Sequence, residues 1–379
     1  MPHEFILKNA RIILENEVLT GSILIRNGQI ADISEGAMTS GEDLEGDFLT
    51  PGLIELHTDH LEGHYAPRPK VRWNPIAAVQ AHDAQIAASG ITTVFDALRV
   101  GLDAETDVGV GDMAVLADAI SDGMKNSRLR AEHFLHLRCE VSAPDCLEAF
   151  SAMQGYDRVR LASLMDHAPG QRQFAEAESY RVYYMRKLKT SEEEFRRYCE
   201  RRMADSERYS AANRAAISGA CQARGIVLAS HDDATVAHVE EAVEQGIRVA
   251  EFPTTLAAAA ASKEAGLSVL MGAPNVVRGG SHSGNVSARE LAEKGCLDIL
   301  SSDYIPFSLM QSAFFLSEVV EGITLPDAMR LVSKNSAEAV GLEDRGEITV
   351  GKRADLVRVR VDDHVPVIRT VWRQGERVI

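Results

Sequence analysis

The stretch that decides the fold is "TPGLIELHTDHLEGH", residues 50–64. Its apolar run, 52–56, predicts a strand buried on both faces. The run ends abruptly in side chains that can bind a metal ion: His57, Asp59, His60, Glu62 and His64. Alternation along a strand places His57 and Asp59 on one face and His60 on the other. We therefore prefer Asp59 to His60 as a ligand, with His60 as the alternative.

Seven further apolar runs in the middle of the chain repeat this pattern. Each ends in polar residues, and helical patterns follow the runs. They read "ITTVFDAL", "EHFLHLRCE", "RVRLASLMDH", "GIVLASHDD", "GIRVAEFPTT", "LSVLMGAPN" and "LDILSSDY". Eight strand–helix units over roughly 290 residues predict a (β/α)₈ barrel, a TIM-like fold of the α/β class.

The two ends of the chain have a different pattern. "FILKNARIIL" and "GSILIRNGQIADIS" near the start, and "GEITVGKRADLVRVRV" near the end, alternate apolar and polar residues as half-buried strands do. Each end alone is too small for a good core. We expect residues 1–50 and 345–379 to build one small β-sandwich, with the barrel, residues 51–344, inserted between its halves.

One interval in the barrel is too long for a single strand–helix unit. His167 and His231 are 64 residues apart, and the segment between them is strongly charged. It predicts a helical insertion at about 170–218, with two or more helices over the barrel mouth. The insertion is either a lid or a solvated excursion with no part in catalysis.

Composition excludes several classes of protein. The net charge of −16 argues against nonspecific binding to nucleic acid or to an anionic membrane. No apolar run is long enough to cross a bilayer, and no secretory signal is visible. The five cysteines have wide spacings without a CxxC pair, which suits reduced thiols. We expect a cytoplasmic protein.

Polar residues follow nearly every predicted strand. In a (β/α)₈ barrel these positions lie together at the catalytic end. Imidazole and carboxylate groups suit zinc or a similar divalent ion, and two ions held close together could both activate water and polarise the bond being cleaved. The candidates are His57, Asp59, Asp96, Glu140, Asp166, His167, His231, Asp232, Asp233, Glu251, Asn275 and Asp303. Asp96 and Glu251 could equally be structural, and Asp232 and Asp233 could orient His231.

"TPGLIELHTD" after a β-rich start, with "GEITVGKRADLV" near the end, resembles the amidohydrolase superfamily. The resemblance implies six metal ligands: His57, Asp59, Glu140, His167, His231 and Asp303. It departs from the usual superfamily pattern at Asp59, where a second histidine is expected. The resemblance also implies one or two divalent ions, with Zn²⁺ preferred over Mn²⁺ or Fe²⁺, and a homodimer or homotetramer.

A narrower resemblance lies in "HTDHLE", "LMDHAPGQRQF", "ASHDDAT", "MGAPNVVRGGSHSGN" and "SSDYIP". Together these are similar to the PhnM-type diphosphatases of phosphonate breakdown. The resemblance implies hydrolysis of α-D-ribose 1-methylphosphonate 5-triphosphate to the 5-phosphate and diphosphate, with Asp303 as the general base. The alternatives are an amidohydrolase acting on a C–N bond, as a deacetylase or deaminase, and a barrel that only binds a partner.

A triphosphate substrate needs cations and backbone N–H donors. The loop after the seventh strand offers an arginine and two successive glycines, and two other loops add basic residues. The predicted substrate-binding residues are Arg68, Arg172, Arg278, Gly279, Gly280 and His282.

Overall fold

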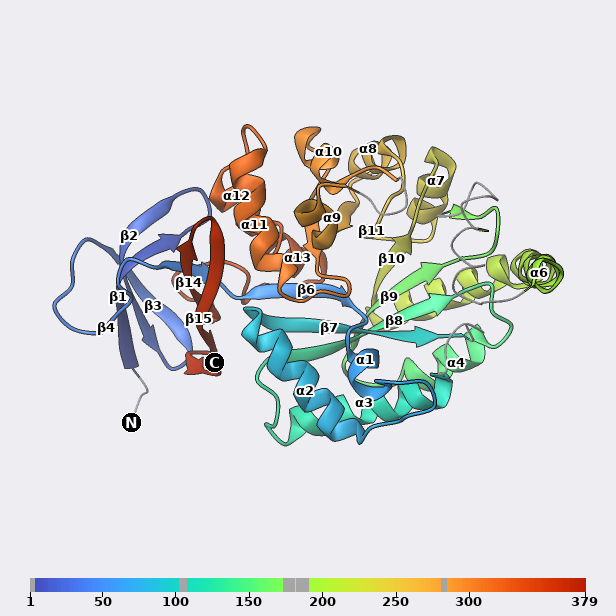
Figure 1. Ribbon diagram of the computed structural model, residues 1–379, viewed down its shortest axis with the longest axis horizontal. Coiled ribbons are helices and arrows are strands. Elements are labelled where there is room, and N and C mark those ends of the chain that lie inside the picture. Colours follow the sequence, from blue (N-terminus) through green and yellow to red (C-terminus); the bar gives the residue numbers. More distant parts are fainter. Residues whose placement is uncertain (1–3, 102–107, 173–180, 182–190, 281–284) are drawn as a thin grey trace.

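The computed structural model describes residues 4–101, 108–172, 181, 191–280 and 285–379. Two sheets of eight strands each organise these residues. Figure 1 shows the sheet from the two ends of the chain at one side of the molecule and the barrel at the other. The functional site predicted from the strand ends therefore belongs to the barrel alone.

Each of the eight apolar runs forms one barrel strand, as predicted. The strands are parallel and pair in sequence order, and a bridge between Thr58 and Asp303 joins the first strand to the residues after the last one. The runs are continuously apolar because both faces of these strands are buried. The strands are β6 (Leu53–Thr58), β7 (Ile91–Val100), β8 (Glu132–Glu140), β9 (Val159–Met165), β10 (Val227–His231), β11 (Val249–Glu251), β12 (Ser268–Gly272) and β13 (Ile299–Ser301).

Helices surround the barrel and bury its outer face. Side chains of β7 and β8 pack with α2, α3 and α4 in one apolar cluster, whereas Phe95, Phe134 and other residues of all eight strands fill a separate cluster in the lumen. None of the described helices has the length and apolar character needed to cross a membrane. The helices are α1 (Leu61–Tyr65), α2 (Pro75–Ala88), α3 (Val110–Lys125), α4 (Cys146–Met153), α6 (Glu192–Arg224), α7 (Val236–Glu244), α8 (Leu256–Glu264), α9 (Ala273–Arg278), α10 (Ala288–Glu293), α11 (Ser308–Val319), α12 (Leu325–Arg330) and α13 (Lys334–Ala339).

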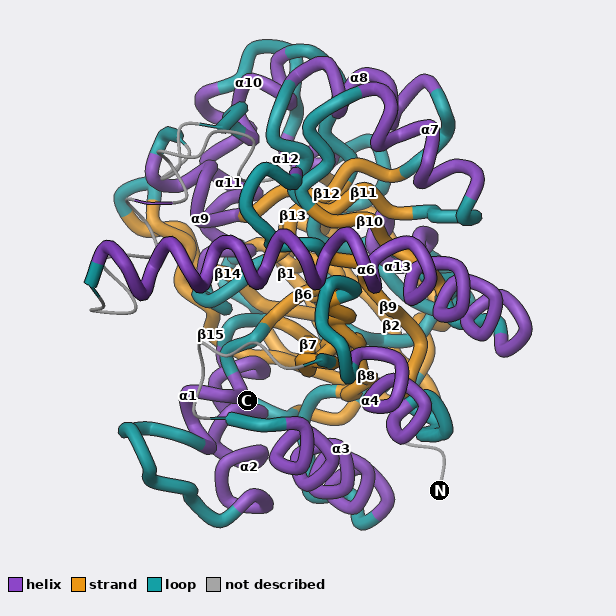
Figure 2. The backbone as a smooth tube through the Cα atoms, turned by 90° about the vertical axis from the view of Figure 1, so that its right-hand side faces the viewer, coloured by secondary structure: helices purple, strands orange, loops and turns teal. Residues whose placement is uncertain are grey.

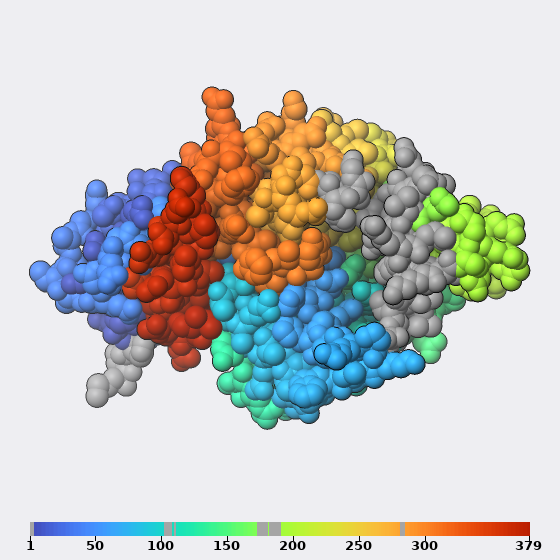
Figure 3. Space-filling view, in the orientation of Figure 1, coloured from blue at the N-terminus to red at the C-terminus, as the bar shows by residue number. Residues whose placement is uncertain are grey.

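The second sheet confirms the composite β domain. Its strand order places β14 directly beside β5, with Leu356 opposite Pro51, so both ends of the chain share one sheet and one apolar cluster around Leu49 and Trp372. Figure 3 shows the C-terminal strands lying against the N-terminal ones. The strands are β1 (Glu4–Ile13), β2 (Val18–Arg26), β3 (Gln29–Glu35), β4 (Glu42–Asp43), β5 (Phe48–Pro51), β14 (Leu356–Asp362), β15 (Val365–Arg373) and β16 (Glu376–Arg377).

The described part of the predicted insertion is dominated by one helix, α6, of 33 residues. A capping box between Ser191 and Glu194 begins it, and Gly225 ends it with a φ of 68°. Figure 2 shows α6 crossing in front of the strand ends. Asn213 of α6 donates a 2.9 Å hydrogen bond to the Val141 carbonyl, which fixes the helix over β8. Most of the insertion before α6, at 173–180 and 182–190, lies outside the described residues.

Candidate functional site

The barrel brings three predicted ligands into contact at its carboxyl end. The ring centroids of His57 and His231 are 5.6 Å apart, and those of His167 and His231 are also 5.6 Å apart. His57 and His231 lie at the carboxyl ends of β6 and β10, and His167 follows β9, so distant segments of the chain meet here as the sequence predicts. Their placement as metal ligands stays a prediction.

Two groups of possible metal ligands lie at the carboxyl end of the barrel. Within each group, one ligand atom from each of three side chains lies within 4.8 Å of the other two. One comprises His57, His136 and Glu251, and the other His167, His231 and Asp232. His231 links them, because its Nδ1 donates a 3.1 Å hydrogen bond to Glu251 Oε2. This hydrogen bond leaves the Nε2 of His231 to face the second group, an arrangement typical of metal-binding histidines.

Several buried polar atoms of the two groups lack a hydrogen-bond partner. They are the Nδ1 of His57, the Oε1 of Glu251 and the Oδ2 of Asp232. His57 Nδ1 lies 3.3 Å from Glu251 Oε1, yet neither atom is hydrogen-bonded. Buried polar atoms are nearly always paired, so orphaned atoms converging on one place indicate a missing partner. A divalent cation fits these nitrogen and oxygen donors.

Glu251 is the charged centre of the first group. It is fully buried, and it also accepts a 2.7 Å hydrogen bond from Ser163 Oγ. Burial alone would raise the pKa of Glu251, but the charges of His57 and His136 hold that pKa well below its usual range. Glu251 is therefore a carboxylate at neutral pH and available to a cation.

Glu140 lies at the edge of the second group. His167 Nδ1 donates to Glu140 Oε2 at 2.6 Å, and Arg202 of α6 donates to Glu140 Oε1 at 3.0 Å. Burial opposes ionisation of Glu140, but the charge of His167 lowers its pKa strongly. Glu140 thus joins the long helix to the histidines at the strand ends.

Asp303 and Asp59 complete the set of predicted ligands. Burial and the charge of Asp59 together raise the pKa of Asp303 to about 6, although the charges of His57 and Arg138 act in the opposite direction. Asp59 accepts a 3.1 Å hydrogen bond from Arg138 Nη1. A carboxyl group with a pKa close to neutrality suits proton transfer, as expected of a general base.

Residues that turn the chain at three strand ends have backbone angles that are rare for their type. Asp232, Phe252 and Asp303 have φ values of 57°, 53° and 55°. Such left-handed residues each cost roughly 1–3 kcal/mol and concentrate at functional sites. The ring of Phe252 packs against two histidines. Its centroid is 5.2 Å from that of His57 and 5.3 Å from that of His231, so the strained turn also supports both rings.

The reasoning from sequence missed His136 and Arg138. Alternation along β8 places His136, Arg138 and Glu140 on one face, and this signal was present in "HLRCE". Arg138 is surrounded by Asp59, Glu62, Asp303 and Glu251. Burial lowers its pKa, but these carboxylates raise it above the usual value. Arg138 therefore offsets the negative charge of the site.

The structure places Asp96 elsewhere, which corrects its inclusion among the strand-end candidates. β7 continues to Val100, so Asp96 lies within the strand, and its carboxylate accepts hydrogen bonds from His82 at 2.8 Å and His133 at 2.7 Å. His82 is on α2 and His133 is on β8, and neither belongs to the ligand groups that contain His57 and His231. The residue does not contribute to the site at the strand ends.

Two further strand-end candidates have structural partners. Asp166 Oδ2 accepts hydrogen bonds from Ser206 at 2.7 Å and Ser210 at 2.6 Å, which anchors α6. Asn275 Oδ1 accepts the 3.0 Å hydrogen bond of the Ala288 N–H at the start of α10. These side chains shape the walls of the barrel mouth.

The predicted phosphate loop ends a helix. The N–H groups of Gly279 and Gly280 donate to the carbonyls of Val276 and Asn275 at 3.2 and 3.1 Å, so they are already used. Arg278 is exposed, and no described residue pairs with it. Arg68 is also exposed, in the loop after α1, and His282 lies outside the described residues. Their contacts with substrate stay predictions.

Arg172 is held in an ion pair. Its guanidinium donates to Asp233, and to Glu241 Oε2 at 2.6 Å, and only 5% of its surface is exposed. It lines a cavity of about 710 Å³ beneath α6 together with Arg214. Contact between Arg172 and a substrate would therefore require the ion pair of Arg172 with Asp233 to open. That substrate contact stays a prediction.

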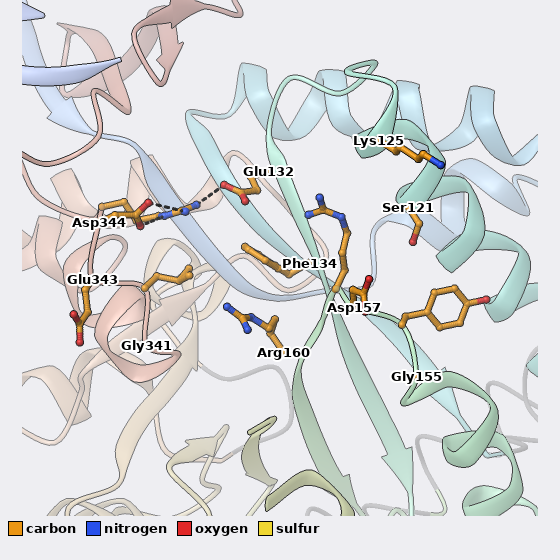
Figure 4. Close-up of a pocket in the computed structure, with 14 residues that line it drawn as sticks. Ser121, Lys125, Glu132, Phe134, Gly155, Asp157, Arg160, Gly341, Glu343 and Asp344 are labelled. Carbon is orange, nitrogen blue, oxygen red and sulfur yellow. Dashed lines mark hydrogen bonds and ion pairs between the residues drawn. The ribbon is translucent and has the colours of Figure 1, made fainter. Parts of the chain in front are cut away.

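A larger cavity lies at the opposite end of the barrel. It has a volume of about 1100 Å³, and Glu132, Phe134, Arg158 and Arg160 line it at the amino ends of β8 and β9 (Figure 4). None of the predicted site residues is among its lining residues. The cavity is therefore distinct from the site that the strand ends define.

Fold and site together define a barrel of the amidohydrolase type, and the comparisons agree. The family model described as "Amidohydrolase family" matches residues 230–379. The α-D-ribose 1-methylphosphonate 5-triphosphate diphosphatase of Escherichia coli (strain K12) is 49% identical over 377 residues, covering 98% of this chain and 100% of the relative. The chain belongs to the family of these diphosphatases, within the amidohydrolases, which confirms the PhnM-type resemblance.

Solved structures agree on the fold. N-acetyl-D-glucosamine-6-phosphate deacetylase from Mycobacterium smegmatis has a TM-score of 0.65 at 16% identity, covering 99% of each chain. 5-methylcytosine deaminase from Klebsiella pneumoniae has a TM-score of 0.61 at 14% identity, covering 99% of this chain and 98% of that one. At these identities the likeness extends to the fold alone.

Proposed function

We infer that this protein hydrolyses α-D-ribose 1-methylphosphonate 5-triphosphate to the 5-phosphate and diphosphate. The observation that carries the inference is the 49% identity to the Escherichia coli diphosphatase along the whole of both chains. A small anionic sugar is thus the substrate class. We also propose a cytoplasmic enzyme that forms a homodimer or homotetramer.

We propose that one or two divalent ions, Zn²⁺ before Mn²⁺ or Fe²⁺, bind among the strand-end residues. The ligands proposed from sequence are His57, Asp59, Glu140, His167, His231 and Asp303, and the geometry adds His136, Asp232 and Glu251 as candidates. A bound ion would act as a Lewis acid on water and on the phosphoryl oxygens.

Residues of the chain would carry out the proton transfer and bind the phosphate groups. Asp303 takes a proton from the attacking water, whose oxygen forms a bond to the phosphorus nearest the ribose. The bond from that phosphorus to the bridging oxygen breaks, and diphosphate leaves with the electron pair. Arg278, Arg172, Arg68 and His282 are proposed to bind the phosphate oxygens, because fixed cations offset charge on the leaving group.

The alternative is hydrolysis of a C–N bond, as in the deacetylases and deaminases that share the fold. Assays for released diphosphate, ammonia and carboxylate separate the two functions. We expect diphosphate from the ribosyl triphosphate and neither other product from amide or amino substrates. The reverse pattern would overturn the proposed function.

Phosphorus NMR on the ribosyl triphosphate with metal-loaded protein is the direct test. The three phosphate signals should be replaced by those of the ribosyl 5-phosphate and diphosphate. Release of inorganic phosphate first, or an unchanged spectrum with protein whose metal content has been verified, would contradict the assignment.

A further inference from the structure

A second group of histidines lies outside the barrel wall. His60 directly precedes α1, His64 lies in the last turn of α1, and His82 is on α2. One ring nitrogen from each lies within 4.8 Å of the other two. The ring centroids of His60 and His64 are 4.9 Å apart, and each is 5.9 Å from that of His82. No residue of this group belongs to the two ligand groups at the strand ends.

All three histidines have a buried ring nitrogen without a hydrogen-bond partner. These atoms are the Nδ1 of His60, the Nε2 of His64 and the Nδ1 of His82. His82 is completely buried, so water cannot satisfy its nitrogen. One orphaned nitrogen would be a packing defect, but three on neighbouring rings of one cluster indicate a shared partner.

The side chains behind His82 fix its ring for metal binding. His82 Nε2 donates a 2.8 Å hydrogen bond to Asp96 Oδ1, which leaves the Nδ1 with its lone pair facing His60 and His64. Asp96 is itself held by His133, whose Nδ1 donates to Asp96 Oδ2 at 2.7 Å. A carboxylate behind a histidine ligand is the usual support in zinc sites.

We propose that His60, His64 and His82 form a second cation site, for Zn²⁺ or a cation of similar preference, outside the barrel between α1 and α2. Three imidazoles with one open position are a known zinc ligand set. Zinc–nitrogen bonds of about 2.0–2.1 Å need nitrogen atoms about 3.4 Å apart. Small side-chain rotations would close the present group to that spacing. The proposal does not depend on the proposed function.

A cation here would tie the segment after Asp59 to the barrel wall. His60 directly follows Asp59, and His82 connects through Asp96 to β7. The ion would therefore hold the segment that carries His57 and Asp59 in place. Its role would be structural, and it would take no part in the reaction.

Zinc content measured in a background without the strand-end site tests the proposal. In His57→Ala/His231→Ala protein, which lacks one ligand from each strand-end group, we expect about one equivalent of zinc to survive dialysis, since the proposed three-histidine site does not include those residues. Adding His64→Ala should remove that zinc, and adding His364→Ala should not. His364 is a matched control because it is exposed and contacts only Glu318 among the described side chains.

Cobalt absorption and thermal unfolding give readouts independent of turnover. Cobalt should produce the visible bands of a four-coordinate site, and zinc should raise the Tm, in the background protein but not after His64→Ala. His64 is only partly buried, so His64→Ala should disturb the fold less than a change at the buried His82, and circular dichroism verifies that the variant is folded. Equal zinc content and an equal Tm rise with and without His64→Ala, or no zinc in the background protein, would overturn the proposal.

Discussion

Thr58 Oγ1 donates a 2.7 Å hydrogen bond to the backbone carbonyl of Asp303. The two residues are 245 positions apart in the sequence, and their contact joins the first barrel strand to the turn after the eighth. Ser301 reinforces this junction by donating to the His57 carbonyl at 2.6 Å. The proposed base and the first proposed ligand are thus positioned by the closure of the barrel.

Replacing the proposed base should abolish turnover while the fold is retained. Asparagine adopts left-handed backbone angles more readily than most residues, so Asp303→Asn should tolerate the φ of 55° at this position. Loss of a positioned base should lower kcat about 10²–10⁴-fold. Diphosphate release measured by phosphorus NMR, with circular dichroism as the folding control, tests this. Turnover within a few-fold of the unaltered protein would show that Asp303 is not the base.

Neutralising Glu251 should weaken metal binding. Glu251→Gln keeps the shape of the side chain but removes the charge that faces His57 at 3.3 Å and His231 at 3.1 Å. Loss of such a supporting carboxylate typically lowers metal affinity or activity about 10–100-fold. Competition with a chelator measures the affinity, and Glu318→Gln, on the surface, is the control. An unchanged affinity would assign Glu251 to packing alone.

Arg172→Ala should destabilise the fold. The change leaves Asp233, which is 1% exposed, as a buried charge without its partner, at a cost of about 3–5 kcal/mol in the free energy of unfolding. Urea unfolding measures the loss, and adding Asp233→Asn should restore part of it. Arg278→Ala is the comparison variant, because Arg278 is exposed. This change should raise KM and leave the urea midpoint of unfolding equal to that of the unaltered protein within error. If Arg172→Ala changes KM but not stability, the ion pair is not structural.

Glu132 should stabilise the junction between the barrel and the composite β domain. Its Oε2 accepts hydrogen bonds from Arg345 at 2.7 Å and Arg353 at 2.6 Å. Burial alone would raise the pKa of Glu132, but the two arginines lower it to about 2. A lowered pKa means that the stabilisation is complete above the unfolded pKa, about 4.5, and is lost as the pH falls towards 2.

Glu132→Gln should therefore cost roughly 1–3 kcal/mol of unfolding free energy at pH 7. The difference between the two proteins should shrink steadily as the pH falls below about 4.5. Urea unfolding at a series of pH values measures it. A difference that is the same at pH 7 and pH 3 would mean that the charge of Glu132 is not the cause.

Much of the fold was predictable because its pattern is local. Continuous apolar runs identify the buried barrel strands, and alternation identifies the half-exposed strands at the two ends. The strand ends are less certain from sequence. The run "ITTVFDAL" gives no sign that β7 continues to Val100, so Asp96 was placed at a strand end although it lies within the strand.

The site was predictable only as a list of residue types. Sequence places Glu251 and His231 at strand ends, but it does not show that Glu251 reaches His57 across the lumen, because that contact depends on barrel closure. Likewise, "RGG" predicts backbone N–H donors for phosphate, whereas the N–H groups of Gly279 and Gly280 donate to carbonyls at the end of a helix. The pairing of Arg172 with Asp233 is equally invisible, since 61 residues separate them.

The pairing of β5 with β14 has a consequence for biosynthesis. Leu356 is synthesised only after the entire barrel has been translated. Until then the edge of β5 that pairs with β14 has no partner strand. Open strand edges are templates for pairing with other chains. The nascent protein is therefore most prone to aggregation just before its last strands emerge.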